Sequence, residues 1–322
     1  MGGTSKNLKV CFLINDWVRL LNRDHTAFFI EFIDALKELY NVEVTDDHPD
    51  AHKGVDYELT VDKGTFLRVH DSEIVIEDLD NNNFYILSAH DQISQCTLQE
   101  KSNPKLKKVL YSQFIPVEII HHTEGSYFKY SPWIYFKYSP IDLEPFRQLR
   151  KESSTNIPKL FFKGKTDDRP ILNYINKEII SDYKPSDSNS YFNDMISHEV
   201  GLALGGVSNG DLCYRDVEYL QLGIPFIKFE YISQLYSPLI PNYHYISIPV
   251  PDDLPIHNSV KKDRLGLEHH AKLVEDKFRN IINDKNLLKT IGENGRKYFE
   301  ANLSPKVRVK KTLELLNYFN NE

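Results

Sequence analysis

Sulfur-containing residues are scarce in this sequence, which holds two methionines and three cysteines among 322 residues. The cysteines, Cys11, Cys96 and Cys213, are odd in number, lie far apart and form no C-x-x-C pair. This spacing argues against a disulfide framework and against a zinc knuckle. We therefore expect a protein of a reducing compartment, the cytoplasm.

Long hydrophobic runs and an excess of positive charge are also missing. No apolar stretch approaches the roughly 18 residues of a membrane-spanning helix, and the start of the chain lacks the apolar core of a signal peptide. The formal net charge is −7, so we expect no general attraction to nucleic acid or to anionic membranes. An anionic ligand would have to be bound by a local arrangement of lysine and arginine.

The apolar patterns of the first half indicate strands that alternate with helices. Residues 8–16 form a continuous apolar run with a polar end, typical of a strand in a parallel sheet. Residues 25–40 have apolar positions at helical spacing, and a further strand is expected at 41–44. Two strands around an Asn-rich turn are predicted at 73–91, and another strand at 107–114.

A charged and then Ser/Thr-rich stretch at 147–158 is the best candidate for a linker. After it the alternation restarts, with strands predicted at 159–164, 198–206, 224–230 and 244–250 and helices at 168–180, 212–222, 266–284, 285–303 and 305–319. We predict an α/β protein with two doubly wound, Rossmann-like domains that face each other across a cleft. The expected boundaries are 1–150 for the first domain, 151–304 for the second and 305–322 for a last helix.

Several short motifs do not carry a function. The glycines after residue 200 do not fall into G-x-G-x-x-G, and the G-K-T at 164–166 has Lys159 where a P-loop needs its first glycine. H-E-V-G-L at 198–202 lacks the second histidine of a zinc-binding H-E-x-x-H motif. No metal site is predicted from these residues.

Two other motifs leave alternatives open. Asp78-Leu79-Asp80 is a D-x-D pattern, which some nucleotide-sugar enzymes use to hold Mn²⁺, but its place beside three asparagines favours a solvated hairpin turn. The repeat YFKYSPWIYFKYSP at 127–140 is either an aromatic surface that stacks on sugar rings or a proline-punctuated segment that docks into the core.

The stretch 196–230 combines several signals that point to one site. A buried strand leads into a loop rich in Gly, Asn and Asp, and a helix begins there. Ligands of open α/β sheets bind at such strand ends, and helix N-termini favour phosphate. Arg215 in the first turn can clamp a diphosphate, Glu218 on the same face can accept hydrogen bonds from ribose, and the two can instead form a surface ion pair. Lys163 and Lys165 would add positive charge.

The order of these motifs resembles a known family. Three segments follow one another along the second half of the chain: GVSNGDLCYRDVEYLQLGIPFIKFEY, YSPLIPNYHYISIP and GENGRKYFEANLSP. The likeness covers about 140 residues (160–302). Together they are similar to the donor-binding half of glycosyltransferases of the GT-B fold, especially the CAP10-like protein glucosyl- and xylosyltransferases. The resemblance implies a transfer of a sugar from a nucleotide-sugar donor to a hydroxyl of a glycan or protein acceptor. We favour a UDP-sugar as the donor, with a GDP-sugar as the alternative.

The resemblance also implies roles for single residues. Arg215 would contact the donor diphosphate and Glu218 the ribose, and Lys163 stands where the family has an arginine. The last helix would pack back on the first domain, and no metal or other cofactor would be needed. The remaining donor-side residues are Lys165, Gly206, Asn209, Gly210, Asp211, His244 and Tyr245. We expect Arg215→Ala to abolish donor binding and to leave the fold intact.

An inverting enzyme would also need a base from the first domain to deprotonate the acceptor. Candidates at the ends of its strands are Asp16, Asp24, His25 and Asp91. Asp24 can instead be the N-cap of the helix that follows, and Asp91 a turn residue. Two other functions stay open, a nucleotide-sugar epimerase or hydrolase of the same fold and a non-catalytic carbohydrate-binding protein.

Overall fold

The computed structural model describes residues 7–12, 34–45, 57–62, 65–69, 73–78, 83–88, 106–111, 142–152, 156–164, 169–181, 187–204, 212–231, 237–251 and 264–315. The chain forms two compact units. Unit 1 comprises Met1–Phe136 together with Ser304–Glu322, and unit 2 comprises Lys137–Leu303.

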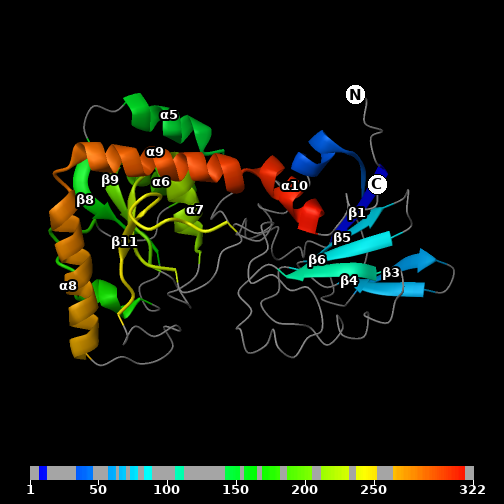
Figure 1. The fold of residues 1–322 in the computed structure, drawn as a ribbon, viewed down its shortest axis with the longest axis horizontal. Helices are drawn as coiled ribbons and strands as arrows, with labels where there is room; N and C mark the ends of the chain where they lie inside the picture. Colours follow the sequence, from blue (N-terminus) through cyan, green and yellow to red (C-terminus); the bar gives the residue numbers. More distant parts are fainter. Residues whose placement is uncertain are drawn as a thin grey trace. The chain divides into compact units, whose positions relative to one another are not determined.

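Unit 1 contains a mixed sheet with the strand order β2-β1-β5-β6-β7 (Figure 1). Its strands are β1 (Asn7–Phe12), β2 (Asn41–Thr45), β5 (Glu73–Asp78), β6 (Asn83–Ser88) and β7 (Leu106–Tyr111). β1 runs parallel to β2 and β6 parallel to β7, whereas β5 runs antiparallel to both of its neighbours. The hairpin predicted at the Asn-rich turn is confirmed, because Asp78 pairs with Asn83. The same hairpin makes the parallel sheet expected for this half wrong, since a turn this short returns the chain antiparallel.

Two further elements complete the described part of unit 1. β3 (Tyr57–Asp62) and β4 (Thr65–Val69) form a separate antiparallel ribbon. The helix α10 (Pro305–Leu315) comes from the end of the chain, and Lys306 on it forms an ion pair with Glu38 of the helical stretch 34–39. Val309 on α10 is fully buried.

Unit 2 is built on a fully parallel sheet in the order β11-β10-β9-β8. Its strands are β8 (Ile157–Phe161), β9 (His198–Leu202), β10 (Phe226–Phe229) and β11 (Ile246–Ile248). Ile180 adds a one-residue parallel bridge to Leu160, on the side of β8 away from β9. Counting this bridge, the chain passes from β8 outward to Ile180 and then back across β8 to β9. The direction of winding therefore reverses between β8 and β9, which makes this pair the topological switch point of the sheet.

Helices cover both faces of the unit 2 sheet. The helix α8 (Arg264–Ile281) and the short 3-10 helix η2 (Pro170–Asn173) pack on one face, and α6 (Ser188–Ser197) and α7 (Tyr214–Leu222) on the other. Outside these lie α5 (Glu144–Glu152), against α6, and α9 (Lys285–Asn302), against α7 (Figure 1). The α/β class predicted from the sequence is confirmed for this unit.

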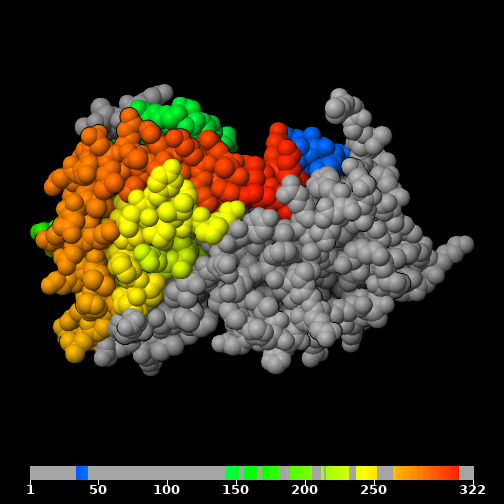
Figure 2. Space-filling model, viewed as in Figure 1, coloured from blue at the N-terminus to red at the C-terminus, as the bar shows by residue number. Residues whose placement is uncertain are grey.

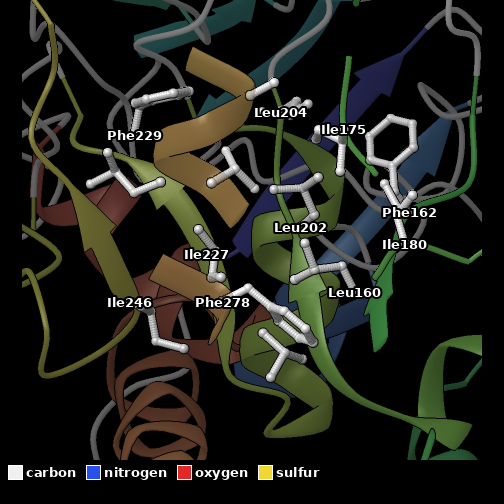
Figure 3. Close-up of a cluster of buried hydrophobic side chains, with 14 of the residues drawn as sticks. Leu160, Phe162, Ile175, Ile180, Leu202, Leu204, Ile227, Phe229, Ile246 and Phe278 are labelled. Atoms are coloured by element: carbon white, nitrogen blue, oxygen red, sulfur yellow. The ribbon is translucent and has the colours of Figure 1, made fainter. Parts of the chain in front are cut away.

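The main core lies between the sheet and α8 (Figure 3). Alternate strand residues point to this side, because side chains along a strand alternate between the two faces. The buried members from the strands and their ends are Leu160, Phe162, Val200, Leu202, Leu204, Ile227, Phe229, Ile246 and Ile248, and Phe278 of α8 packs against them. Each fully buried side chain of this type contributes about 1.5–3 kcal/mol relative to an exposed one.

Three helices differ from the sequence prediction. The helix expected at 168–180 is only the 3-10 turn η2, because Asn176 Oδ1 accepts a hydrogen bond from Glu178 N (2.9 Å) and the backbone around Ile180 bonds to β8 instead. α6 was not predicted; Asp187 caps it by accepting from Ser190 N at 3.0 Å. The helix α5 occupies the first part of the stretch predicted as a linker. Arg150 on α5 holds the helix to unit 2 by donating to the carbonyl oxygens of Ile196 and His198.

Candidate functional site

The carboxyl ends of β8 and β9 define the candidate site, because ligands of open α/β sheets bind outside a switch point. Lys163 and Gly164 follow β8, and Leu204 follows β9. The first turn of α7 begins nearby, since Arg215 on this turn contacts the backbone of Lys163. The structure therefore brings together Lys163 and Arg215, two of the residues predicted to contact a diphosphate.

Arg215 is held in a fixed position at the end of β8. Its Nε donates to the Lys163 carbonyl oxygen at 3.1 Å, and its Nη2 donates to the same atom. Its Cζ lies 4.5 Å from the centroid of the Phe162 ring, a cation–π geometry. The residue is only 9% exposed, so it is nearly buried.

Gly164 is the residue that makes room for this guanidinium. A Cβ at position 164 would lie 2.1 Å from Arg215 Nη2, and the Gly164 φ of +151° is one that L-residues rarely adopt. Only glycine satisfies both conditions. The Lys-Gly pair after β8 therefore serves to seat Arg215 against the strand end.

Arg169 is a cation at the same place that sequence reasoning missed. Its Nε donates to the carbonyl oxygen of Leu204 at 3.2 Å, and its Cζ lies 5.6 Å from the Phe162 ring centroid. It is half-buried and therefore more accessible than Arg215. The sequence placed Arg169 inside a helix, but the restriction that Pro170 puts on the preceding residue pointed to an extended backbone at this position.

Lys163 is half-buried and forms an ion pair with Asp194 of α6. Its side chain thus connects the end of β8 with the helix that precedes β9. Lys163, Arg169 and Arg215 are three cations around the switch point, two of them on one aromatic ring. An oxyanion placed here would meet forked donors, which suit the geometry of phosphate oxygens.

The start of α7 is fixed by a buried ion pair. Asp216 accepts from the backbone N of Cys213 at 2.8 Å, which caps the helix, and its Oδ2 lies 3.1 Å from Lys228 Nζ of β10. Both side chains are essentially fully buried, and Lys228 also lies over the Tyr231 ring. Burial raises the pKa of the Cys213 thiol, so that this cysteine stays protonated.

Glu218 has no exposed surface. Its Oε2 accepts a hydrogen bond from Tyr191 Oη of α6 at 2.8 Å, and burial raises the pKa of Tyr191 well above its ordinary value, with a further contribution from Glu218. Arg215 and Glu218 are both buried, so the alternative weighed from the sequence, an ion pair on a solvated helix face, does not describe them. Glu218 joins α6 to α7, and its contact with a ribose stays a prediction.

α7 packs closely on the sheet beside this site. A Cβ at Gly201 would lie 2.4 Å from the Tyr219 ring, and Tyr219 Oη donates to the Phe161 carbonyl oxygen at 3.0 Å. The glycine in β9 thus allows the helix to approach the strands. This contact fixes the position of α7 on the sheet, and therefore the position of Arg215 relative to the end of β8.

His244 and Tyr245 lie elsewhere in unit 2. They precede β11 at the far side of the sheet, with β9 and β10 between them and β8. Tyr245 is buried and stacks on Phe226 with ring centroids 5.8 Å apart. His244 accepts from Ile240 N at 2.9 Å and lines a separate cavity of about 520 Å³. The structure does not bring these two residues to the switch point.

The other predicted site residues lie outside the described part of the chain. They are Asp16, Asp24, His25, Asp91, Lys165, Gly206, Asn209, Gly210 and Asp211. The aromatic repeat at 127–140 lies outside it as well. Their roles stay predictions.

No group of three or more His, Cys, Asp and Glu side chains in the described ranges is arranged to hold a metal ion. Among the helices that the structure describes, none combines the length and the apolar character needed to cross a membrane.

The comparisons with known proteins give little further information. The chain matches no protein family and no curated protein. Among solved structures it is similar to a glycosyltransferase from Rickettsia africae ESF-5, with a TM-score of 0.43 and 14% sequence identity, over 100% of this chain and 84% of the other. The assignment to the CAP10-like group is therefore left to the motif resemblance.

Proposed function

We propose that this protein is a glycosyltransferase that takes its sugar from a nucleotide-sugar donor. The observation that carries the proposal is the Arg215 guanidinium, which is fixed at the carboxyl end of β8, at the switch point of a parallel sheet and in the first turn of α7. A cation in this place suits a diphosphate, because strand ends and helix N-termini of open α/β sheets are where phosphates bind.

The donor diphosphate would be held by three cations. In this proposal Arg215 contacts the diphosphate from the first turn of α7, and Arg169 and Lys163 approach it from the ends of β8 and β9. In the transition state negative charge develops on the leaving nucleotide, and these cations are already in place to stabilise it. In this proposal the side chains supply the charge that a metal ion supplies in other enzymes, and no cofactor beyond the donor is required.

The order of the motifs in unit 2 supports the choice of a glycosyl donor over other diphosphates. It resembles the donor-binding half of GT-B enzymes, including the CAP10-like group, and favours UDP-sugars over GDP-sugars. The acceptor would be a hydroxyl of a glycan or of a glycoprotein. For an inverting reaction Asp16, Asp24, His25 and Asp91 of unit 1 remain the proposed sources of the base.

A thermal-shift screen with UDP- and GDP-sugars tests the proposal. A donor that binds the folded state raises stability by RT ln(1 + [L]/Kd), so we expect one nucleotide to raise the melting temperature in a concentration-dependent way. The sugar nucleotide that binds is then incubated with the protein alone. If the protein only isomerises or hydrolyses the sugar nucleotide, and transfers no sugar to an acceptor, it is an epimerase or a hydrolase and the transferase proposal is wrong.

The site residues need variants that leave the fold in place. The expectation that Arg215→Ala keeps the fold intact is not supported, because this side chain is buried and donates to a backbone carbonyl. Arg169→Gln is the better test, since Arg169 is half-buried. Arg264→Gln is the matched control, an exposed arginine on α8. We expect the first variant to weaken nucleotide binding and the second to leave it unchanged.

A further inference from the structure

A second cluster of cations surrounds a cavity at the opposite edge of the unit 2 sheet. The cavity has a volume of about 720 Å³ and is lined by residues that precede the strands, by α5 and by α9. α5 and α9 lie side by side on the surface of the unit (Figure 2), and Arg296 of α9 lies 3.9 Å from Glu144 of α5. Seven arginine and lysine side chains and three glutamates line this cavity, although the whole chain is acidic.

Two of the arginines are attached to backbone carbonyls. Arg150 Nη1 donates to the carbonyl oxygens of Ile196 (2.8 Å) and His198 (2.6 Å), where α6 ends and β9 begins. Arg296 Nη1 donates to the Gln221 carbonyl oxygen (2.6 Å) near the end of α7. These contacts satisfy the negative C-terminal ends of two helices that would otherwise repel an anion at this edge.

Most of the other cations have a carboxylate partner. Lys285 pairs with Glu199, Lys289 with Glu293 at 4.0 Å, and Arg296 also with Glu300 at 2.8 Å. Arg147 pairs with Glu144 on α5. Each of these four pairs is close to neutral as a unit.

Three cations remain without a carboxylate in ion-pair distance among the described residues. They are Arg150, Lys151 and Lys297, and both lysines are exposed. Burial lowers the pKa of Arg150 to about 10. The seven cations of the cavity against its three glutamates and the adjacent Glu144 leave a net charge of 7 − 4 = +3.

We propose that this cavity binds a small multivalent oxyanion, such as a phosphate-bearing metabolite, through the net positive charge of its lining, to which Lys151 and Lys297 contribute. The cavity is within the range of about 300–1,000 Å³ that is usual for small-ligand sites. Lysine ammonium groups bind phosphate as point charges. The site is separate from the donor site, because it lies at the start of the strands and Arg215 lies at their end.

Isothermal titration calorimetry with inorganic pyrophosphate and with inorganic phosphate tests this site, with UDP present at saturation so that the proposed donor site is already occupied. We expect pyrophosphate to bind more tightly than phosphate and its affinity to fall with rising salt, since exposed charges are screened. The double variant Lys151→Gln/Lys297→Gln should bind pyrophosphate about tenfold or more weakly than wild type, a change of about one decade in Kd. Its affinity for UDP should stay that of wild type.

The matched control is Lys177→Gln/Lys272→Gln, which removes two exposed positive charges, one in the segment after η2 and one on α8; neither lysine lines the cavity. It should bind pyrophosphate with wild-type affinity. Equal pyrophosphate affinity in all three proteins would overturn the proposal, as would the failure of millimolar pyrophosphate to bind wild type. If both double variants lose pyrophosphate affinity to the same extent, the loss follows from the overall charge of the protein and not from the cavity, and the proposal is wrong.

Discussion

The two edges of the unit 2 sheet handle positive charge in different ways. At the carboxyl edge Arg215 and Lys228 are buried, and each is fixed by a backbone carbonyl, an aromatic ring or a carboxylate. At the amino edge Lys151 and Lys297 are exposed and make no ion pair with described residues. A buried cation is part of the fold as well as of a site, whereas an exposed cation can be removed without cost to the fold. Substitutions of the buried cations at the carboxyl edge should therefore lower stability, whereas substitutions of the exposed lysines at the amino edge should change ligand binding and leave stability unchanged.

The largest effect is expected at Lys228. Lys228→Met leaves the Asp216 carboxylate buried without its cation, which costs about 3–5 kcal/mol for a broken buried pair. The free energy of unfolding in urea measures this loss. The double variant Lys228→Met/Asp216→Asn should recover a large part of it, because it removes the uncompensated charge and keeps an acceptor for the Cys213 N–H. A single variant as stable as wild type would contradict the comparison of the two edges.

A smaller effect is expected at Gly164. Gly164→Ala introduces a Cβ that collides with Arg215 and a backbone φ that alanine avoids, and overpacking of this kind costs about 1–3 kcal/mol. Urea unfolding of Gly164→Ala, Arg215→Lys and the double variant forms a cycle. If the collision is the cause, the double variant loses less stability than the sum of the two single losses. Strict additivity would show that the backbone alone requires glycine.

At the amino edge, His198 should make stability depend on pH. Burial lowers the pKa of His198, although its Nδ1 lies 2.6 Å from the Asp194 carbonyl oxygen. The unfolded state therefore binds more protons, and this stability is full above the unfolded pKa of about 6.5 and declines as the pH falls below it. When the pH is lowered from about 7.5 to about 5, the range in which this histidine titrates, the free energy of unfolding of His198→Gln should fall less than that of wild type. If the free energy of unfolding depends on pH in the same way in both proteins, His198 is not the cause of the pH dependence.

The smallest effect on stability is expected for Lys151→Gln/Lys297→Gln. Exposed side chains without partners contribute within about ±0.5 kcal/mol, so the urea midpoint should equal that of wild type. A loss of unfolding free energy above about 1 kcal/mol would show that these lysines stabilise the fold, as the buried cations at the carboxyl edge do.

Much of the parallel half of the fold was predictable from the sequence. The strands of unit 2 are short apolar runs bounded by glycine, proline or polar residues, and α7, α8 and α9 show clear helical spacing. The missed helix α6 has few strong helix formers, and its packing through Tyr191 and Phe192 decides its structure. The switch point was not predictable, because it depends on the single pairing of Ile180 with Leu160.

The site was predictable to a lesser degree. Arg215 at the start of a helix after a strand was visible in the sequence, and the structure places it at the end of β8. Its contact with a diphosphate stays a proposal. The role of Gly164 depends on a distance between segments about 50 residues apart and could not be read from either one. His244 and Tyr245 were assigned by motif order, but the parallel sheet carries them two strands away from the switch point.

Calorimetric titration of UDP into wild type, Arg169→Gln and Arg264→Gln tests the central claim most directly. We expect wild type to bind UDP, Arg169→Gln to bind it about tenfold or more weakly, and Arg264→Gln to differ from wild type by no more than about twofold. The same affinity in Arg169→Gln as in wild type, or no binding of UDP or GDP to wild type, would contradict a nucleotide site at the switch point.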